Sequence, residues 1–197
     1  LNLHIKTNNH LGQMPIHFAA MKNSLSTFIE IIKLGGNPLA EDSTGKNAFY
    51  YALAYGTKFF VSHVAKMPSF LYEMSSPKVL IPIVQNPEAA SLFSSVIHFI
   101  DPSATRSCDE RGMTLLSLAA EHNNRQIIDQ LLILGIDPTK PANNGRNSIH
   151  ICAENNAIGC STLIIKFLLL TRGFDEVNKI LNSADEKGDL PIHIAAR

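Results

Sequence analysis

Histidine, cysteine and aspartate side chains recur along this 197-residue chain, where they invite comparison with metal or hydrolytic sites. No H-x-x-x-H or C-x-x-C spacing occurs among the eight histidines and three cysteines, and so few scattered cysteines do not make a zinc framework. His150 lies two residues from Cys152, a separation that points the two side chains in divergent directions on a helix and argues against a Cys–His protease. We therefore expect no catalytic residue, no bound metal and no cofactor in this fragment.

Three aspartates resemble catalytic carboxylates only until their spacing is considered. Asp42, Asp109 and Asp185 each stand three residues before a glycine that opens a recurring signature. A shared place in a repeat indicates a shared structural role, so we interpret all three as turn-forming residues. No segment matches the phosphate-binding pattern G-x-x-x-x-G-K-[ST] either.

The signature reads G-Q-M-P-I-H from Gly12 and returns in variant form at Gly45, Gly112, Gly145 and Gly188. The five glycines are separated by 33, 67, 33 and 43 residues. A period of this length is typical of a stacked array of supersecondary units. The place of each side chain within the repeat therefore decides what that side chain can do.

Each repeat has the signals of two short helices. Pro15 and Pro191 suit the first helical turn, where a missing N–H costs nothing, and Thr114 and Asn147 stand where an N-cap oxygen is wanted. Pairs of small or apolar residues, such as Ala119-Ala120, allow two helices to approach closely. The second helix carries paired apolar residues four positions apart and ends at a glycine.

This pattern resembles the ankyrin repeat, whose motif is D-x-x-G-x-T-P-L-H-x-A-A followed by a second helix that ends in L-L-x-x-G-A-D. The resemblance implies an all-α fold, an ankyrin-repeat solenoid of helix-turn-helix units joined by β-turn or hairpin loops. It also implies that His17, His150 and His193 form structural hydrogen bonds between neighbouring repeats. We expect one domain over residues 1–197, with repeats at about 9–41, 42–75, 76–108 (degenerate), 109–141, 142–184 (with an insertion of about ten residues) and 185–197 (partial).

Two of the glycine separations depart from the period. The 67-residue gap is about twice the period, so we expect a cryptic helix pair over residues 77–108, with Pro82 in the place of the signature proline. The 43-residue gap holds about ten extra residues, which we place between Arg172 and Ser183. Residues 174–181 are expected to add a short helix there.

Composition narrows the classes of function. The formal net charge is zero and no basic run occurs, so nucleic-acid binding lacks its electrostatic footprint. The longest apolar stretch, Leu163 to Leu170, is broken by Lys166 and is far shorter than the ~20 residues of a membrane span, so we expect a buried second helix there. Free cysteines fit a reducing cytosol. The chain begins at Leu1 and stops at Arg197 within a repeat, from which we expect a fragment of a longer protein.

By the same resemblance, a partner is expected to bind the concave face, made of the turn tips and the exposed side of the first helices. Binding energy concentrates in a few aromatic and charged anchors, and positions flanking the repeat glycine or following the alanine pair supply the candidates. These candidates are Tyr55, Arg111, Met113, His122, Arg146, Lys46, Glu121 and Asn155.

The sequence favours a protein–protein interaction scaffold in the cytoplasm that binds another protein, and we expect a monomer. An alternative is a substrate-recruiting or targeting arm of a larger multidomain protein. Frequent asparagine, isoleucine and lysine suit a secreted effector of an intracellular bacterium, in which case the host cytosol would be its location.

Overall fold

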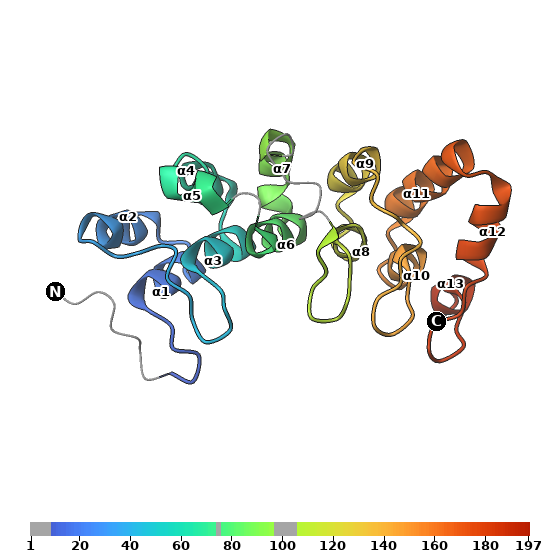
Figure 1. Ribbon diagram of the computed structural model, residues 1–197, viewed down its shortest axis with the longest axis horizontal. Coiled ribbons are helices and arrows are strands. Elements are labelled where there is room, and N and C mark those ends of the chain that lie inside the picture. The colour runs from blue at the N-terminus through green and yellow to red at the C-terminus, as the bar shows by residue number, and fades with distance from the viewer. Residues whose placement is uncertain (1–8, 74–75, 97–105) are drawn as a thin grey trace. The chain divides into compact units, whose positions relative to one another are not determined.

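The computed structural model describes residues 9–73, 76–96 and 106–197, which fold almost entirely into short helices (Figure 1). Contacts divide the chain into two compact units, Leu1–Ile100 (unit 1) and Asp101–Arg197 (unit 2), each described here by itself. Besides helices and turns, the described residues contain one isolated antiparallel bridge between Cys108 and Thr114. The predicted all-α fold is confirmed, whereas the single-domain boundaries stay a prediction.

Unit 1 is built from helices that alternate between two layers. Its elements are α1 (Pro15–Met21), α2 (Leu25–Lys33), α3 (Ala48–Tyr55), α4 (Lys58–Val64), α5 (Pro68–Glu73), α6 (Pro77–Gln85), the 3-10 helix η1 (Pro87–Ala89) and α7 (Ala90–Val96). The first helices α1, α3 and α6 pack in sequence against one another, while α2 and α4 pack on α1 and α3. Figure 1 shows the hairpin that connects one repeat to the next projecting from the first-helix layer.

Phenylalanine rings fill the space between these two layers. Phe28 of α2 meets Phe60 of α4 edge-on, with ring centroids 5.3 Å apart. Phe49 of α3 meets Phe70 of α5 in the same way at 5.4 Å. All four side chains are fully buried, and aromatic rings favour this edge-to-face contact over flat stacking. The core is therefore continuous from one repeat to the next, as in other solenoids.

The expected cryptic repeat is present as a helix pair, α6 and α7, but its register differs from the sequence prediction. Pro82 lies inside α6, which begins at Pro77, so the placement of Pro82 at the start of the first helix is wrong. Leu80, Ile83 and Val84 of this helix, on both sides of Pro82, are fully buried. The segment after α7 lies outside the described residues, so the rest of the 77–108 prediction is untested there.

Unit 2 repeats the same two-layer arrangement. Its helices are α8 (Leu115–Glu121), α9 (Arg125–Ile133), α10 (Ser148–Glu154), α11 (Ile158–Thr171), α12 (Phe174–Leu181) and α13 (Pro191–Ala195). The first helices α8, α10 and α13 pack in sequence, the second helix α9 packs on α8, and α11 packs on both α9 and α10. The predicted insertion helix is confirmed as α12, which packs on α11.

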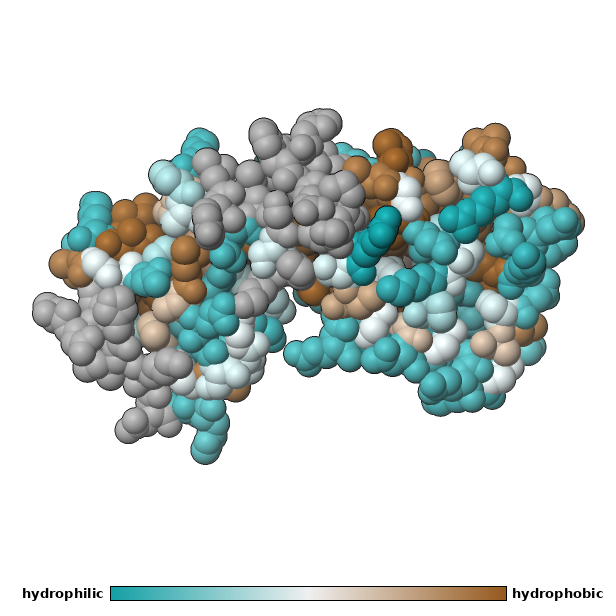
Figure 2. All heavy atoms as spheres, viewed as in Figure 1, coloured by the Kyte–Doolittle hydropathy of each residue, from teal (hydrophilic) through white to brown (hydrophobic). Residues whose placement is uncertain are grey.

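The expected buried second helix is present as α11, whose apolar stretch is buried on one face. Cys160, Ile164 and Leu168 face the core, but Leu169 and Leu170 are exposed at the far end of the helix. In Figure 2 brown, apolar side chains accordingly reach the surface along the second-helix row of unit 2. The helix α11 has 14 residues against nine in α9, and the exposed Leu169 and Leu170 lie in its last turn.

Local signals behave as predicted at the helix ends. The side chains of Thr114 and Asn147 accept hydrogen bonds from backbone N–H groups in the first turns of α8 and α10. Pro15 and Pro191 are the first residues of their helices. Gly135 follows α9 with φ of +78°, a left-handed conformation that favours glycine. These ends fix the length of each helix and thus the place of the hairpins.

Candidate protein-binding surface

Hairpins with an aspartate at their base project from the first-helix layer of each unit. The Asp109 carboxylate accepts hydrogen bonds from the backbone N–H groups of Arg111 and Met113, both at 2.9 Å. Asp42 and Asp185 hold the same turn in their own repeats. The interpretation of these three aspartates as turn formers is confirmed.

Successive hairpins within unit 2 are joined backbone to backbone. The N–H of Asn143 donates to the carbonyl of Arg111 at 2.9 Å, and the N–H of Glu186 donates to the carbonyl of Asn144 at 3.1 Å. Gly112 has φ of +72°, and a Cβ there would collide with Asn143. The signature glycine is therefore needed for one hairpin to lie against the next, and the hairpin tips form a fixed row.

The signature histidines serve this same framework. His17 Nε2 lies 2.8 Å from the carbonyl of Ala40, and His150 Nε2 lies 3.1 Å from the carbonyl of Asp189 in the following hairpin. Burial lowers the pKa of His150 below its ordinary value, which favours a neutral ring. Among the described residues, no three His, Cys, Asp or Glu side chains gather as a metal-binding group. The structural interpretation of His17 and His150 is confirmed.

A buried polar network lies beneath the hairpin-side surface of unit 1. The Tyr51 hydroxyl donates to the Asp42 carboxylate at 2.5 Å and accepts from Gln13 Nε2 at 3.0 Å. Burial, reinforced by the bond to Asp42, raises the pKa of Tyr51 to about 12. Burial alone would raise the pKa of Asp42, but hydrogen bonds from Tyr51, Thr44 and Lys46 together lower it. Tyr51 is thereby held rigidly in one position.

Exposed aromatic side chains extend from this network along α3. The Tyr55 ring stacks on Tyr51 with centroids 6.3 Å apart and planes 13° from parallel, and it is 60% exposed. Tyr50 packs edge-on against Tyr51, and the Lys46 ammonium lies 4.9 Å from the centroid of the Tyr50 ring. Tyr50, Tyr51 and Tyr55 thus form an aromatic row in unit 1, with Lys46 over one end of it. Lys46 and Tyr55 are two of the predicted candidates.

In unit 2, three candidates come together at one hairpin. The Arg111 guanidinium donates two hydrogen bonds of 2.8 Å to the Glu121 carboxylate and one of 2.9 Å to Asp109. This bonding lowers the pKa of Glu121 and raises that of Arg111. His122, the residue after α8, lies 3.8 Å from Glu121 through its Nε2. Arg111, Glu121 and His122 therefore form one partly exposed cluster.

The next hairpin repeats this pairing between a hairpin residue and the end of the first helix. Arg146 donates to Glu154 at 2.8 Å and to Asp185 of the following hairpin at 3.0 Å. Burial acts to raise the pKa of Asp185, but hydrogen bonds from Arg146 and from backbone N–H groups outweigh this effect and lower the pKa to about 2. In the last repeat the charges are exchanged, because the hairpin carries the acidic Asp189 and the end of the first helix carries Arg197, which donates to it. Arg111, Arg146 and Arg197 are thus each paired with a carboxylate of the same unit.

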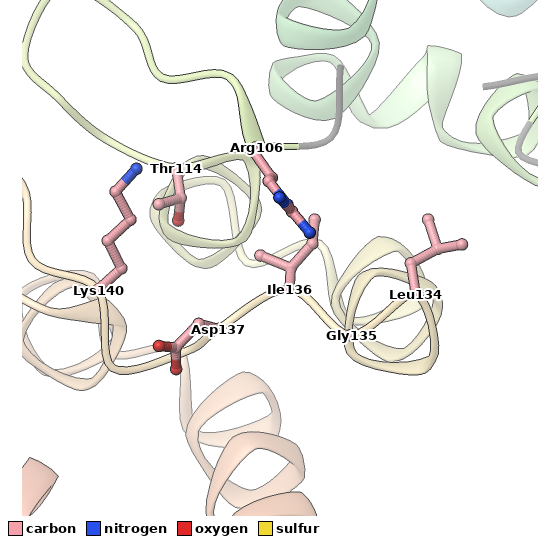
Figure 3. Close-up of a pocket in the computed structure, with 7 residues that line it drawn as sticks. All are labelled: Arg106, Thr114, Leu134, Gly135, Ile136, Asp137 and Lys140. Carbon is pink, nitrogen blue, oxygen red and sulfur yellow. The ribbon is translucent and has the colours of Figure 1, made fainter. Parts of the chain in front are cut away.

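A cavity of about 330 Å³ lies beside residues 134–140, the segment that follows α9 (Figure 3). Arg106, Lys140 and Asp137 line it together with the backbone at Gly135. Arg172 neutralises Asp137 at 3.0 Å, and the Lys140 ammonium donates to Cys108 Sγ at 3.4 Å. The lining brings together no nucleophile, base and orienting group of the kind that hydrolysis requires.

Comparison with known proteins identifies the architecture. Residues 84–178 and 116–197 match the family model of ankyrin repeats in three copies, which together spans more than half of the chain. The chain belongs to the ankyrin-repeat family. It is also similar to the crystal structure of the ankyrin repeat domain of Bcl-3, described as a unique member of the IkappaB protein family. The two share 18% identity and a TM-score of 0.58, over 97% of this chain and 81% of that one, a likeness that concerns the fold.

Not every predicted contact residue lies on the surface of this ankyrin-repeat chain. Met113 is only 4% exposed, so the expectation that its side chain is available to a partner does not hold. Its position follows the repeat glycine, and Gln13 at the same position of the first repeat is buried as well. Asn155 is exposed, but its amide donates to the carbonyl of Ile151 at the end of α10.

Sequence reasoning missed the neighbours that orient the candidates. Tyr50 carries the contact between Lys46 and the aromatic row, and Glu154 and Asp185 neutralise Arg146. The sequence contained a signal for such pairs, because the residues one and nine positions after the repeat glycine carry opposite charges in the last two repeats. They are Arg146 with Glu154 and Asp189 with Arg197. None of the described helices has the length and apolar character that a bilayer-spanning helix requires.

Proposed function

We propose that this ankyrin-repeat chain is a protein-interaction scaffold that binds another protein through the hairpin-side surface of each of its two units. We define this surface by side chains of the first helices and hairpins: Lys46, Tyr50 and Tyr55 in unit 1, and Arg111, Glu121, His122, Arg146, Glu154 and Asn155 in unit 2. Ankyrin repeats generally mediate protein–protein interaction, which supports the assignment. Binding by this surface involves no catalytic step.

The observation that carries the proposal is the exposed ring of Tyr55. The ring stacks on Tyr51, which Asp42 and Gln13 hold by hydrogen bonds. A side chain that is already ordered loses little conformational entropy when a partner covers it, and tyrosine is among the residues enriched at binding hot spots. Tyr55 therefore has the properties of an anchor for a partner's side chain or backbone.

The charges of unit 2 support a protein partner of mixed character. Arg111, Arg146 and Arg197 each pair with carboxylates of the same surface, so these three cations are neutralised within it. The exposed His122 and Asn155 add hydrogen-bonding groups at the ends of the first helices. This combination suits the polar rim of a protein interface.

Replacement of Tyr55 by alanine tests the proposal. A partner recovered by affinity capture should bind the Tyr55→Ala protein about tenfold more weakly, a loss of ~1.4 kcal/mol that is typical of an anchor residue. Phe59→Ala is the matched control, because Phe59 is 66% exposed but belongs to the second-helix layer. Equal affinity of wild type and Tyr55→Ala in calorimetry, with both folded, would refute the role of this surface.

A further inference from the structure

Two cationic side chains line the cavity beside residues 134–140 of unit 2. The cavity encloses about 330 Å³, which lies within the range of roughly 300–1,000 Å³ that small-molecule sites occupy. The exposed Arg106 and Lys140 lie on either side of Thr114 in Figure 3, and the buried Ile136 adds an apolar part to the lining. The cavity can therefore receive a small molecule that carries anionic groups.

Neighbouring carboxylates do not neutralise these two cations. Unlike the arginines of the hairpin-side surface, Arg106 and Lys140 form no ion pair with a carboxylate in the part of the chain that the structure describes. Asp137, which also lines the cavity, pairs with Arg172 at 3.0 Å instead. Charge complementarity thus favours an anionic ligand at Arg106 and Lys140.

A thiol stands at the edge of the same cavity. The Lys140 ammonium donates to Cys108 Sγ at 3.4 Å, and this thiol donates to the backbone carbonyl of Arg106 at 3.8 Å. The antiparallel bridge between Cys108 and Thr114 fixes the backbone there, and Cys108 is partly exposed. An accessible sulfur, an ammonium group and a cavity of small-molecule size therefore meet in one place.

The turn at this hairpin does not require either the thiol or the guanidinium. Cys108 directly precedes the turn aspartate Asp109, and Arg106 lies two residues before Cys108. The hairpins of Asp42 and Asp185 form the same turn with other residues at these two places. Those residues are Leu39 and Glu41 before Asp42, and Asn182 and Ala184 before Asp185. Arg106 and Cys108 are thus available for a ligand.

We propose that this cavity binds glutathione disulfide and that Cys108 is its site of attachment. Each half of this disulfide is a tripeptide with two carboxylates and one ammonium group. Arg106 and Lys140 receive the carboxylates of the half that becomes attached, because both side chains donate several hydrogen bonds and lack a carboxylate partner. The Oδ1 atom of Asp137 already accepts from Thr139 and Arg172, so the ligand's ammonium group binds at Oδ2.

The attachment is a thiol–disulfide exchange. The Cys108 thiol gives its proton to solvent, and the thiolate attacks one sulfur of the bound disulfide while Lys140 donates a hydrogen bond to it. A bond forms between Cys108 Sγ and that sulfur, and the sulfur–sulfur bond of glutathione disulfide breaks. Its electron pair leaves with the second glutathione, which takes up a proton from solvent. Cys108 is oxidised and the released half of the disulfide is reduced.

The rate of attachment measures the recognition, with glutathione disulfide and the uncharged 2-hydroxyethyl disulfide as the two probes. Mass spectrometry follows each reaction, and peptide mapping assigns it to Cys108. Arg106→Gln should slow the reaction of glutathione disulfide about fivefold, the effect of one lost charge contact, and leave that of the uncharged disulfide unchanged. Arg125→Gln is the matched control, because Arg125 is an exposed cation outside this cavity, and both of its rates should equal those of wild type. Lys140→Gln should slow both reactions, since Lys140 also contacts the thiol.

A second measurement uses the unaltered protein. S-methylglutathione has the carboxylates of glutathione but no reactive disulfide, so it should slow the reaction of glutathione disulfide in a saturable way. Absence of this competition, or an Arg106→Gln protein that is folded by circular dichroism and reacts with both disulfides as wild type does, would overturn the proposal. Attachment that maps to the buried Cys152 or Cys160 would also overturn it. The Tyr55→Ala protein should react normally, so this site and the hairpin-side surface can fail separately.

Discussion

The Tyr51 hydroxyl joins the first two repeats of unit 1, and its removal tests how the aromatic row is held. It donates to Asp42 at 2.5 Å and accepts from Gln13 at 3.0 Å, and all three residues are buried. In Tyr51→Phe the ring keeps its volume and its stacking contact with Tyr55. The carboxylate of Asp42 nevertheless loses a donor and the amide of Gln13 loses an acceptor in a place where water has little access.

The expected cost follows from these two bonds. A hydrogen bond to a charged group contributes about 1.5–3 kcal/mol and a neutral one about 0.5–1.5 kcal/mol, so we expect a loss of roughly 2–4.5 kcal/mol. The folded-state pKa of Asp42 is lowered, which means that its stabilising contribution is present above its unfolded pKa of about 3.9 and is lost as the pH falls through the folded value. The difference between wild type and Tyr51→Phe should therefore be full at pH 7 and shrink in acid.

Urea denaturation at pH 7 measures this difference, and Tyr55→Phe is the matched control. Tyr55 is mostly exposed, so loss of its hydroxyl should change stability by no more than ~0.5 kcal/mol. A Tyr51→Phe protein as stable as Tyr55→Phe would refute the reasoning, because the network would then contribute nothing beyond what the ring contributes. A loss that stayed constant down to pH 3 would refute the role of Asp42 in it.

Three other predictions concern unit 2. Leu131 is fully buried in α9, so Leu131→Ala should cost ~2–5 kcal/mol in urea denaturation, with faster hydrogen exchange mainly in neighbouring helices; a loss below ~1 kcal/mol would contradict this burial. Cys108 should react with a thiol reagent in the native protein, whereas the buried Cys152, whose pKa burial raises to about 12, should react only after unfolding; equal rates would show that α10 opens readily. The folded-state pKa values of His150 and Asp185 are both lowered, so each group stabilises the fold less as the pH falls. The free energy of unfolding should therefore decrease below about pH 6.5, where the buried His150 resists protonation, and again from about pH 4 toward 2 as Asp185 is protonated. Thermal melts with an unchanged midpoint from pH 7 to pH 3 would contradict both assignments.

Local rules were sufficient for most of the fold. Turn aspartates, N-caps and the glycine after α9 act within a few residues of themselves, so their spacing predicted the helices and the insertion helix α12. The register of α6 was not predictable from Pro82, because a proline usually marks the first turn of a helix. Leu80, Ile83 and Val84 on both sides of this proline are buried, and burial depends on neighbouring helices.

The candidate surface was predictable by position but not by environment. The repeat frame placed Arg111 and His122 near each other, and the structure brings them together around Glu121. The frame also placed Met113 on the surface, yet an apolar side chain at that position turns into the core. Gln13 at the same position of the first repeat is buried as well, so the repeat frame alone does not decide whether a side chain there stays in solvent.

Calorimetry of partner binding to Tyr55→Ala, to His122→Ala and to the double variant tests the central claim most directly. These residues belong to separate units and share no contact partner among the interactions described, so their effects on the binding free energy should add. We expect each single change to weaken binding by ~1 kcal/mol or more and the double change by roughly the sum, with Phe59→Ala and Ile133→Ala unchanged. Unaltered affinity in the folded double variant, together with weaker binding by the two second-helix controls, would contradict the claim and place the interface on the second-helix layer.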